Sequence, residues 1–303
     1  MTEFTLRQLA YFVAVAEEGT LTDAATRLHV SASALSAALT DLETSLGVQL
    51  CVRRKARGVT LTPSGVHLLD QARTVLKAAG EVRYLAGMPG GELRGPVTIG
   101  CYPTLAPTVL PRLLDGVARK HQHLTLTIVE APQDSLQRGL EDGSLDLSID
   151  YDLQLGGGPN RVLLYEARAH VLLPAEHPLA EADAVRLEQL MQEPFILLDI
   201  PPSTDHTRSL FAELGGPPPA RHRSTSYETV RALVGRGLGW SVLVQRPANA
   251  LSYEGLPVVV KEIEPRVLPI GVHLTWPGNL ALSPRARAVV DVARALSWPL
   301  PSA

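Results

Sequence analysis

Apolar residues recur every three or four positions through the first part of the chain, which predicts a series of helices. The first predicted helix ends before Gly19. Two shorter helices follow between Thr20 and Gly47, with Thr20 and Ser31 as their N-caps and a break at His29. Small residues on both helices permit a close, steep crossing, so this stretch is typical of a helix-turn-helix.

The pattern then changes to two short strands and one long helix. Val48–Val52 and Val59–Leu61 flank a basic, glycine-ended turn, which predicts a hairpin wing beside the helix-turn-helix. Thr62 and Pro63 open a helix that runs to Ala86, and its narrow apolar seam suits pairing with another helix. The glycine- and proline-rich stretch after it predicts a hinge.

Strands and helices alternate from Pro96 onward, which favours a mostly parallel sheet with helices on both faces. The later strands imply a second lobe inserted within the first, with a cleft where strand C-termini meet. The predicted fold class is therefore α/β with an N-terminal winged helix-turn-helix and a two-lobed, periplasmic-binding-protein-like effector domain. The expected segments are 1–62 for the winged domain, 63–87 for a linker or dimerisation helix, 88–95 for a hinge, and 96–303 for the effector domain, with lobe I at about 96–165 and 266–303 and lobe II at about 166–265.

Composition narrows the class of protein. The 303 residues are 45% hydrophobic and 19% charged, as in ordinary globular proteins. No apolar run reaches the ~20 residues that span a bilayer, and the N-terminus lacks a secretion signal. Two cysteines fit a reducing compartment. We therefore expect a cytoplasmic protein with no membrane partner.

The formal net charge of −3 is compatible with DNA binding, because the charges are unevenly distributed between the N-terminal part of the chain and the rest. Residues 1–88 carry nine Lys or Arg against eight Asp or Glu, and the excess of acid lies in the remainder. A local cluster matters more than the total charge. That cluster lies in the predicted wing and consists of Arg53, Arg54, Lys55 and Arg57.

The order of these parts resembles the LysR-type transcriptional regulators over nearly the whole chain. The N-terminal motif residues of that family occur here as Ala24, Ala25, Leu28, Ser31, Ala34, Leu35, Ser36, Leu42, Glu43, Leu46, Gly47, Leu50, Leu61, Thr62 and Gly65. In the second half, IGCYPTLAP, HPLA and SYETVRALVGRGLGWSVL are similar to the family's effector-binding domain. The resemblance implies a winged helix-turn-helix that binds double-stranded DNA and a domain that binds a small molecule.

The recognition helix departs from the family pattern. Gln-Pro and a following basic residue are common there, whereas this chain has Ala32, Ser33 and Ala37. The first half of the helix therefore offers no arginine for guanine. We expect more reliance on phosphate contacts and DNA shape, while a degenerate, weakly binding helix is the alternative. The expected DNA-contacting residues are Arg27, Ser31, Ala32, Ser33, Ser36, Thr40, Arg53, Arg54, Lys55 and Arg57.

The effector site is expected at the cleft. The resemblance implies that the Thr104 hydroxyl, at a helix start, contacts an anionic effector, whereas the plain alternative is a helix cap. Several acidic residues near strand ends instead favour an amine-bearing effector, although such aspartates are commonly caps and turn formers. The expected effector-binding residues are Cys101, Tyr102, Thr104, Glu130, Asp150, Asp199, Ser203, Tyr227 and Glu228.

No nucleophile, metal-ligand or phosphate-loop motif occurs, so the sequence predicts neither an enzyme nor a cofactor. We expect a homodimer or homotetramer that regulates transcription, with RNA polymerase as a candidate partner. Two alternatives remain open, a solute-binding protein and an α/β enzyme with an accessory N-terminal helical domain.

Overall fold

The computed structural model describes residues 4–54, 58–86, 93–153, 160–278 and 282–298. Backbone contacts divide the chain into two compact units. Unit 1 comprises Met1–Gly95 with Arg138–Leu145, and unit 2 comprises Pro96–Gln137 with Asp146–Ala303. Among the described residues, no helix is long and apolar enough to cross a membrane.

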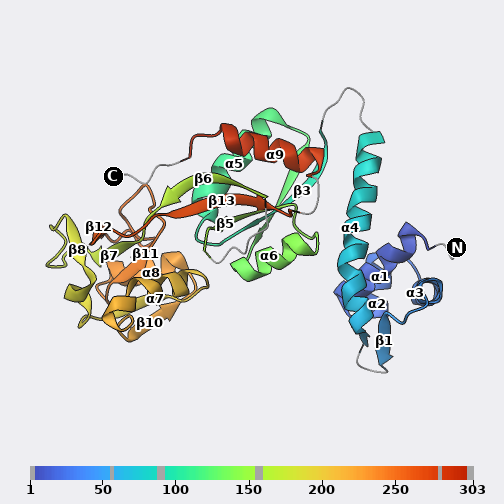
Figure 1. Cartoon of the computed structure of the whole chain (residues 1–303), viewed down its shortest axis with the longest axis horizontal. Coiled ribbons are helices and arrows are strands. Elements are labelled where there is room, and N and C mark those ends of the chain that lie inside the picture. Colours follow the sequence, from blue (N-terminus) through green and yellow to red (C-terminus); the bar gives the residue numbers. More distant parts are fainter. Residues whose placement is uncertain (1–3, 55–57, 87–92, 154–159, 279–281, 299–303) are drawn as a thin grey trace. The chain divides into compact units, whose positions relative to one another are not determined.

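Unit 1 contains three short helices, a hairpin and one long helix (Figure 1). They are α1 (Leu6–Glu18), α2 (Leu21–Arg27), α3 (Ala32–Leu46), β1 (Cys51–Arg54), β2 (Gly58–Leu61) and α4 (Pro63–Ala86). Thr5, Thr20 and Ser31 cap the short helices with their hydroxyls, as the sequence predicts for the last two. Gly19 and Gly47 end α1 and α3 in the left-handed conformation.

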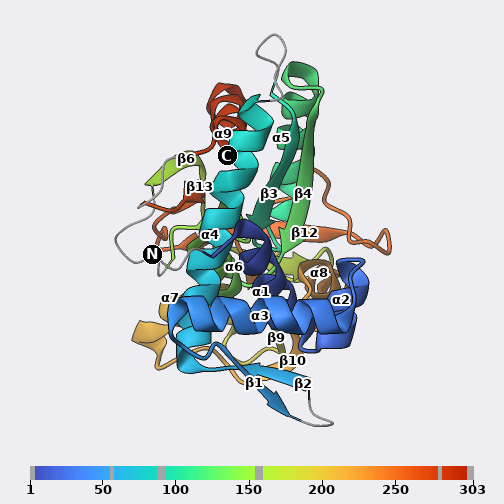
Figure 2. The ribbon, with the colours of Figure 1, turned by 90° about the vertical axis from the view of Figure 1, so that its right-hand side faces the viewer.

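The hairpin is held to the helices by specific contacts. Glu43 Oε1 accepts the backbone N–H groups of Leu50 and Cys51 at 2.8 and 2.9 Å, which anchors the start of β1. The N–H of Val59 donates to the carbonyl of Gly19 at 2.7 Å and ties β2 to the end of α1. Figure 2 places the antiparallel β1–β2 pair beside α3. The predicted wing is confirmed as a hairpin.

Unit 1 has its own hydrophobic core. Helix α1 packs against α2, α3 and α4. The centre of the core is formed by fully buried residues of α1 and α3 and by Leu50, which precedes β1; the helix residues are Phe12, Val15, Leu35, Leu39 and Leu42. This core fixes α3 and leaves the opposite side of that helix open to solvent.

Unit 2 begins with a five-stranded sheet in the order β4-β3-β5-β13-β6, which we call sheet I. Its strands are β3 (Gly95–Cys101), β4 (Leu124–Glu130), β5 (Leu147–Tyr151), β6 (Asn160–Ala167) and β13 (Ile270–Trp276). Its helices are α5 (Ala106–Lys120), α6 (Gln133–Glu141) and α9 (Pro284–Ala295), and α5 lies against α9 (Figure 1). β3 and β5 are parallel, but β13 is antiparallel to both of its neighbours. The sheet is therefore mixed, and the prediction of a mostly parallel sheet was wrong because β13 arrives late in the chain without a crossover helix.

The remaining elements form a second lobe. Its four-stranded sheet, sheet II, has the order β11-β7-β12-β8, and β9 pairs in parallel with β10. These elements are β7 (His170–Pro174), β8 (Ala184–Arg186), β9 (Phe195–Leu198), α7 (Ser203–Leu210), β10 (Ala220–Ser224), α8 (Tyr227–Gly235), β11 (Ser241–Leu243) and β12 (Val258–Glu264), with two 3₁₀ turns at Leu187–Leu190 and Ala212–Leu214. β6 and β7 follow each other closely in the chain but belong to different sheets.

Candidate functional site

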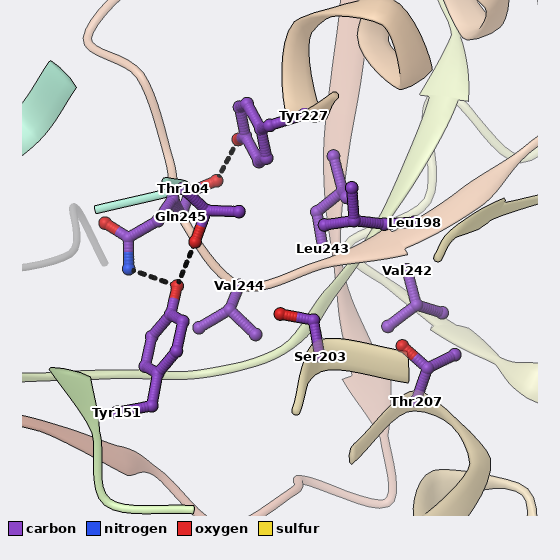
Figure 3. A pocket seen from close by; sticks show the side chains of 10 residues that line it. All are labelled: Thr104, Tyr151, Leu198, Ser203, Thr207, Tyr227, Val242, Leu243, Val244 and Gln245. Carbon is purple, nitrogen blue, oxygen red and sulfur yellow. Dashed lines mark hydrogen bonds between the residues drawn. The ribbon is translucent and has the colours of Figure 1, made fainter. Parts of the chain in front are cut away.

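A pocket lies in unit 2 where the two sheets approach each other (Figure 3). It contains about 250 Å³ of non-atom space, open solvent at its mouth included. Its walls come from β5 of sheet I, from β9, from β11 of sheet II and the residues after it, from α7 and α8, and from the segment before α5. The lining residues are Thr104, Tyr151, Leu198, Ser203, Thr207, Tyr227, Val242, Leu243, Val244 and Gln245.

Chain direction explains why these residues meet. Tyr151 ends β5 and Leu198 ends β9, so both lie where ligands bind in open α/β sheets. Ser203 is the first residue of α7, and Tyr227 is the first residue of α8. Gln245 follows β11, at the end of a buried apolar run.

Gln245 is the centre of the polar network of this site. It is 3% exposed, and its Nε2 donates to the Tyr151 hydroxyl at 2.9 Å. The Tyr165 hydroxyl donates to Gln245 Oε1 at 2.9 Å, and the Tyr227 hydroxyl donates to its carbonyl. Tyr151 and Tyr165 belong to sheet I, whereas Gln245 follows a strand of sheet II. One amide side chain therefore links the two lobes.

Thr104 extends this network rather than capping a helix. Its Oγ1 lies 3.1 Å from the Tyr151 hydroxyl, which also accepts from Gln245 (Figure 3). Helix α5 begins at Ala106, and its N-cap is Leu105, which has no side-chain capping bond. The helix thus begins two residues later than the start expected at Thr104. The Thr104 hydroxyl is turned toward the pocket and not toward the helix.

A second link between the lobes is made by Tyr102. Its hydroxyl donates to the carbonyl of Ile200 at 3.0 Å, so Ser203 Oγ, at 2.9 Å, is the donor to Tyr102. The Tyr102 and Tyr151 rings pack edge to face with centroids 5.5 Å apart. Burial raises the pKa of Tyr102 to about 12 and also raises the pKa of Tyr151 and Tyr227. The phenols therefore stay neutral at physiological pH.

The acidic residues predicted for the cleft lie outside the pocket lining. Glu130 is exposed at the end of β4. Asp199 pairs with Arg223 at 3.4 Å, and Glu228 pairs with Arg231 at 3.0 Å. Of the residues predicted to bind effector, Thr104, Ser203 and Tyr227 line the pocket, while Tyr102 contacts Ser203 beside it.

Cys101 and Asp150 are buried near the end of the sheet I strands, away from the pocket lining. Burial raises the pKa of the Cys101 thiol, and the nearby carboxyls of Asp150 and Glu130 raise it further. The pKa of Asp150 is raised to about 7 by desolvation, although Ser148 donates a hydrogen bond to it at 2.5 Å. Asp150 is thus buried outside the pocket lining, with one carboxyl oxygen bonded to Ser148.

Sequence reasoning missed Tyr151, Leu198, Thr207 and the segment Val242–Gln245. Strand alternation could have found Tyr151, because neighbours on a strand point to opposite faces. Asp150 drew attention by its charge, yet the next residue is the one that lines the pocket. Leu198 and Val242–Val244 read only as core residues in the sequence.

Unit 1 presents a polar face on α3. Ala32, Ser33, Ala37 and Thr40 are exposed there, while Ser36 is half-buried. Ser31 Oγ is engaged as the N-cap, since it accepts from the N–H of Ala34 at 3.1 Å.

The basic residues predicted to contact DNA are only partly described. Arg27 forms ion pairs with Glu17 and Glu18 at 2.8 and 3.0 Å. Arg53 and Arg54 lie on β1, and Lys55 and Arg57 lie outside the described residues.

A helix-turn-helix with a hairpin in one unit and a pocket between two lobes in the other define a DNA-binding regulator with its own effector domain. Comparison with protein families gives the particular class. The model of the bacterial regulatory helix-turn-helix protein, lysR family, matches residues 6–66, and the LysR substrate binding domain model matches residues 90–297. The chain belongs to the LysR family and is a DNA-binding transcriptional regulator, not an enzyme.

Individual relatives agree with this assignment. The chain is 38% identical to a probable hydrogen peroxide-inducible genes activator of Mycobacterium avium over 64% of its own length and 62% of that protein. It is 35% identical to the protein of the same name from Mycobacterium leprae over 80% and 79% of the two chains.

Solved structures of the same family cover almost the whole chain. HinK, a LysR family transcriptional regulator from Pseudomonas aeruginosa, is 34% identical over 98% of this chain and 99% of its own, with a TM-score of 0.63. A full-length cysteine variant of OxyR from Pseudomonas aeruginosa is 30% identical over 97% and 98% of the two chains, with a TM-score of 0.75.

The raised pKa of Asp150 predicts a pH-dependent stability. The folded state favours the protonated carboxyl, so the stabilisation is present below the unfolded pKa of 3.8 and is lost as pH rises to about 7. The loss across this window is up to about 4 kcal/mol, since each pKa unit corresponds to about 1.4 kcal/mol. Asp150→Asn should therefore stabilise the protein more at pH 8 than at pH 5, measured by urea unfolding.

The matched control is Asp115→Asn, because the Asp115 side chain is 62% exposed. This control should have the same small effect at both pH values. An equal effect of Asp150→Asn at pH 5 and pH 8 would contradict the assignment of the buried carboxyl.

Proposed function

We propose that this regulator binds a small effector in the pocket beside Gln245 and that binding alters the spacing of its two lobes. The supporting observation is that Thr104, Tyr151 and Gln245 line the pocket and also bond to one another between the lobes. An effector that bonds to these groups must replace bonds that hold the lobes together. A ligand that binds one lobe spacing better than another shifts the population, and that shift is the signal to DNA.

DNA contact is proposed for α3 and the wing. The exposed face of α3 carries Ala32, Ser33 and Thr40, which are short enough for a helix to sit deep in a major groove. Ser31, Ser36 and the basic residues Arg53, Arg54, Lys55 and Arg57 complete the proposed interface. Arg27 is a weaker candidate, because a phosphate would have to compete with Glu17 and Glu18.

We propose that α4 forms the contact between subunits. Val75 and Val82 are 43% and 68% exposed and are seven residues apart, so they lie on one stripe of the helix. A stripe of this kind suits a homodimer, or two such dimers in a tetramer. The proposed parts are the winged domain to 62, the linker helix to 87, the hinge to 95 and the effector domain beyond it. We place the protein in the cytoplasm, with RNA polymerase as a further partner.

A peroxide sensor is the second candidate, because the two mycobacterial relatives are named as peroxide-inducible activators. Oxidation by peroxide requires an accessible thiolate. The chain has two cysteines, Cys51 and Cys101, which are 3% and 0% exposed. Burial also raises the pKa of Cys101. These properties disfavour thiol-based sensing by this chain.

The DNA-binding proposal is tested by titrating the protein with its own upstream DNA over a salt series. The double change Arg53→Ala and Arg54→Ala should weaken binding and reduce the slope of log affinity against log salt by about 0.9 for each phosphate that the wing no longer neutralises. The control is Arg119→Ala, at a solvent-exposed arginine of α5. An unchanged slope in the double variant would refute the wing contacts, and no specific binding by the wild type would refute the regulator itself.

Because both thiols are buried, hydrogen peroxide should leave the affinity for this DNA unchanged. The same titration with and without peroxide, followed by mass measurement of both thiols, checks the prediction. A peroxide-dependent change in affinity that Cys101→Ala abolishes would instead establish the second candidate. Cys51→Ala is the matched control, because Cys51 is also buried but lies in the hairpin.

A further inference from the structure

The pocket lining has a chemical character that narrows the effector class. Thr104, Tyr151, Ser203, Thr207 and Tyr227 provide hydroxyls, and Gln245 provides an amide. The other lining residues are aliphatic, namely Leu198, Val242, Leu243 and Val244. Among the described residues, therefore, the pocket is lined by no ionisable side chain other than its neutral phenols.

Arg231 and Asp199, two charged residues close to lining residues, already have partners of opposite charge. Arg231, behind Tyr227, is 1% exposed, and its Nε donates to Glu228 at 3.0 Å. Its terminal nitrogen donates to the carbonyl of Leu251 at 2.6 Å. Asp199, next to the lining residue Leu198, pairs with Arg223. An ionic ligand would thus be buried without a counter-charge, which is costly.

Thr207 supplies the anchoring group for an uncharged ligand. It is 4% exposed, lines the pocket, and lies one helical turn after Ser203 on the same face of α7 (Figure 3). Within the described part of the chain, no side chain or backbone group forms a hydrogen bond with its hydroxyl. Ser203 Oγ, in contrast, is engaged with Tyr102. The Thr207 hydroxyl is therefore free to bind a ligand at no cost to the protein's own bonds.

The apolar part of the lining indicates the form of the ligand. The aliphatic wall of Val242–Val244 and Leu198 suits a compact apolar body, while the hydroxyl of Thr207 suits one polar group. We infer that the effector is an uncharged alcohol or phenol, anchored through Thr207. This inference rests on the proposed effector function of the same pocket.

Three probes of nearly equal shape test the inference on the full chain. They are benzyl alcohol, benzoate and benzylamine, which are neutral, anionic and cationic at pH 7. Calorimetric titration and thermal shift should detect binding of benzyl alcohol and little or none of the two ions. Binding of either ion as tight as that of the alcohol, or no binding of the alcohol, would overturn the inference.

The substitution Thr207→Val tests the role of the Thr207 hydroxyl, because valine keeps the shape of the side chain and removes the hydroxyl. The melting temperature without ligand should be unchanged, and the Kd for benzyl alcohol should rise about fivefold, as expected for the removal of one hydrogen bond. Thr108→Val, in α5 outside the pocket lining, should leave the Kd unchanged. An unchanged Kd in Thr207→Val would overturn the anchoring role.

DNA titration of the same preparations distinguishes a failure of the ligand class from a failure of the proposed effector function. A wild type that binds its upstream DNA but not benzyl alcohol would refute the ligand class and leave the regulator intact. A wild type that binds the alcohol with no change in DNA affinity would refute the effector function of the pocket and leave its binding chemistry intact.

Discussion

The effector domain depends on one buried amide, because Gln245 joins residues of sheet I to the end of a strand of sheet II. A buried amide without partners would cost free energy, so the tyrosines and Gln245 must stay together as long as the lobes are closed. The pocket lies among these same groups. A ligand that enters the pocket would therefore act directly on the hydrogen bonds that link the two lobes. No other residues of this domain would be needed to couple ligand binding to lobe spacing.

The two units of the regulator have different surfaces and different roles. In unit 1, the capped helices and the Glu43 anchor hold α3 and the hairpin rigidly, while the exposed face of α3 is nearly free of long side chains. In unit 2, Asp199 and Glu228 pair with arginines outside the pocket lining, and the lining itself is neutral and rich in hydroxyls. The amine-bearing effector suggested by the acidic residues thus loses its physical basis, since Asp199 and Glu228 already have arginine partners.

Local signals in the sequence predicted local structure well. Ser31, Gly47 and Thr62 mark element ends by their own chemistry, so α3 and the start of α4 could be predicted from neighbouring residues alone. The site depended on longer-range geometry. Gln245 meets Tyr151 and Tyr165 only because the chain crosses between the sheets, and no spacing rule encodes that meeting. The antiparallel pairing of β13 with β5 and β6 could not be predicted for the same reason.

A double-mutant cycle on Tyr151→Phe and Gln245→Met tests the central claim most directly. Unfolding free energies of the wild type, both single variants and the double variant give the coupling between the two side chains. The coupling free energy should be about 1 kcal/mol or more, because each single change leaves a buried polar group without its partner. Additive effects, within about 0.3 kcal/mol, would contradict the claim that this bond holds the lobes together.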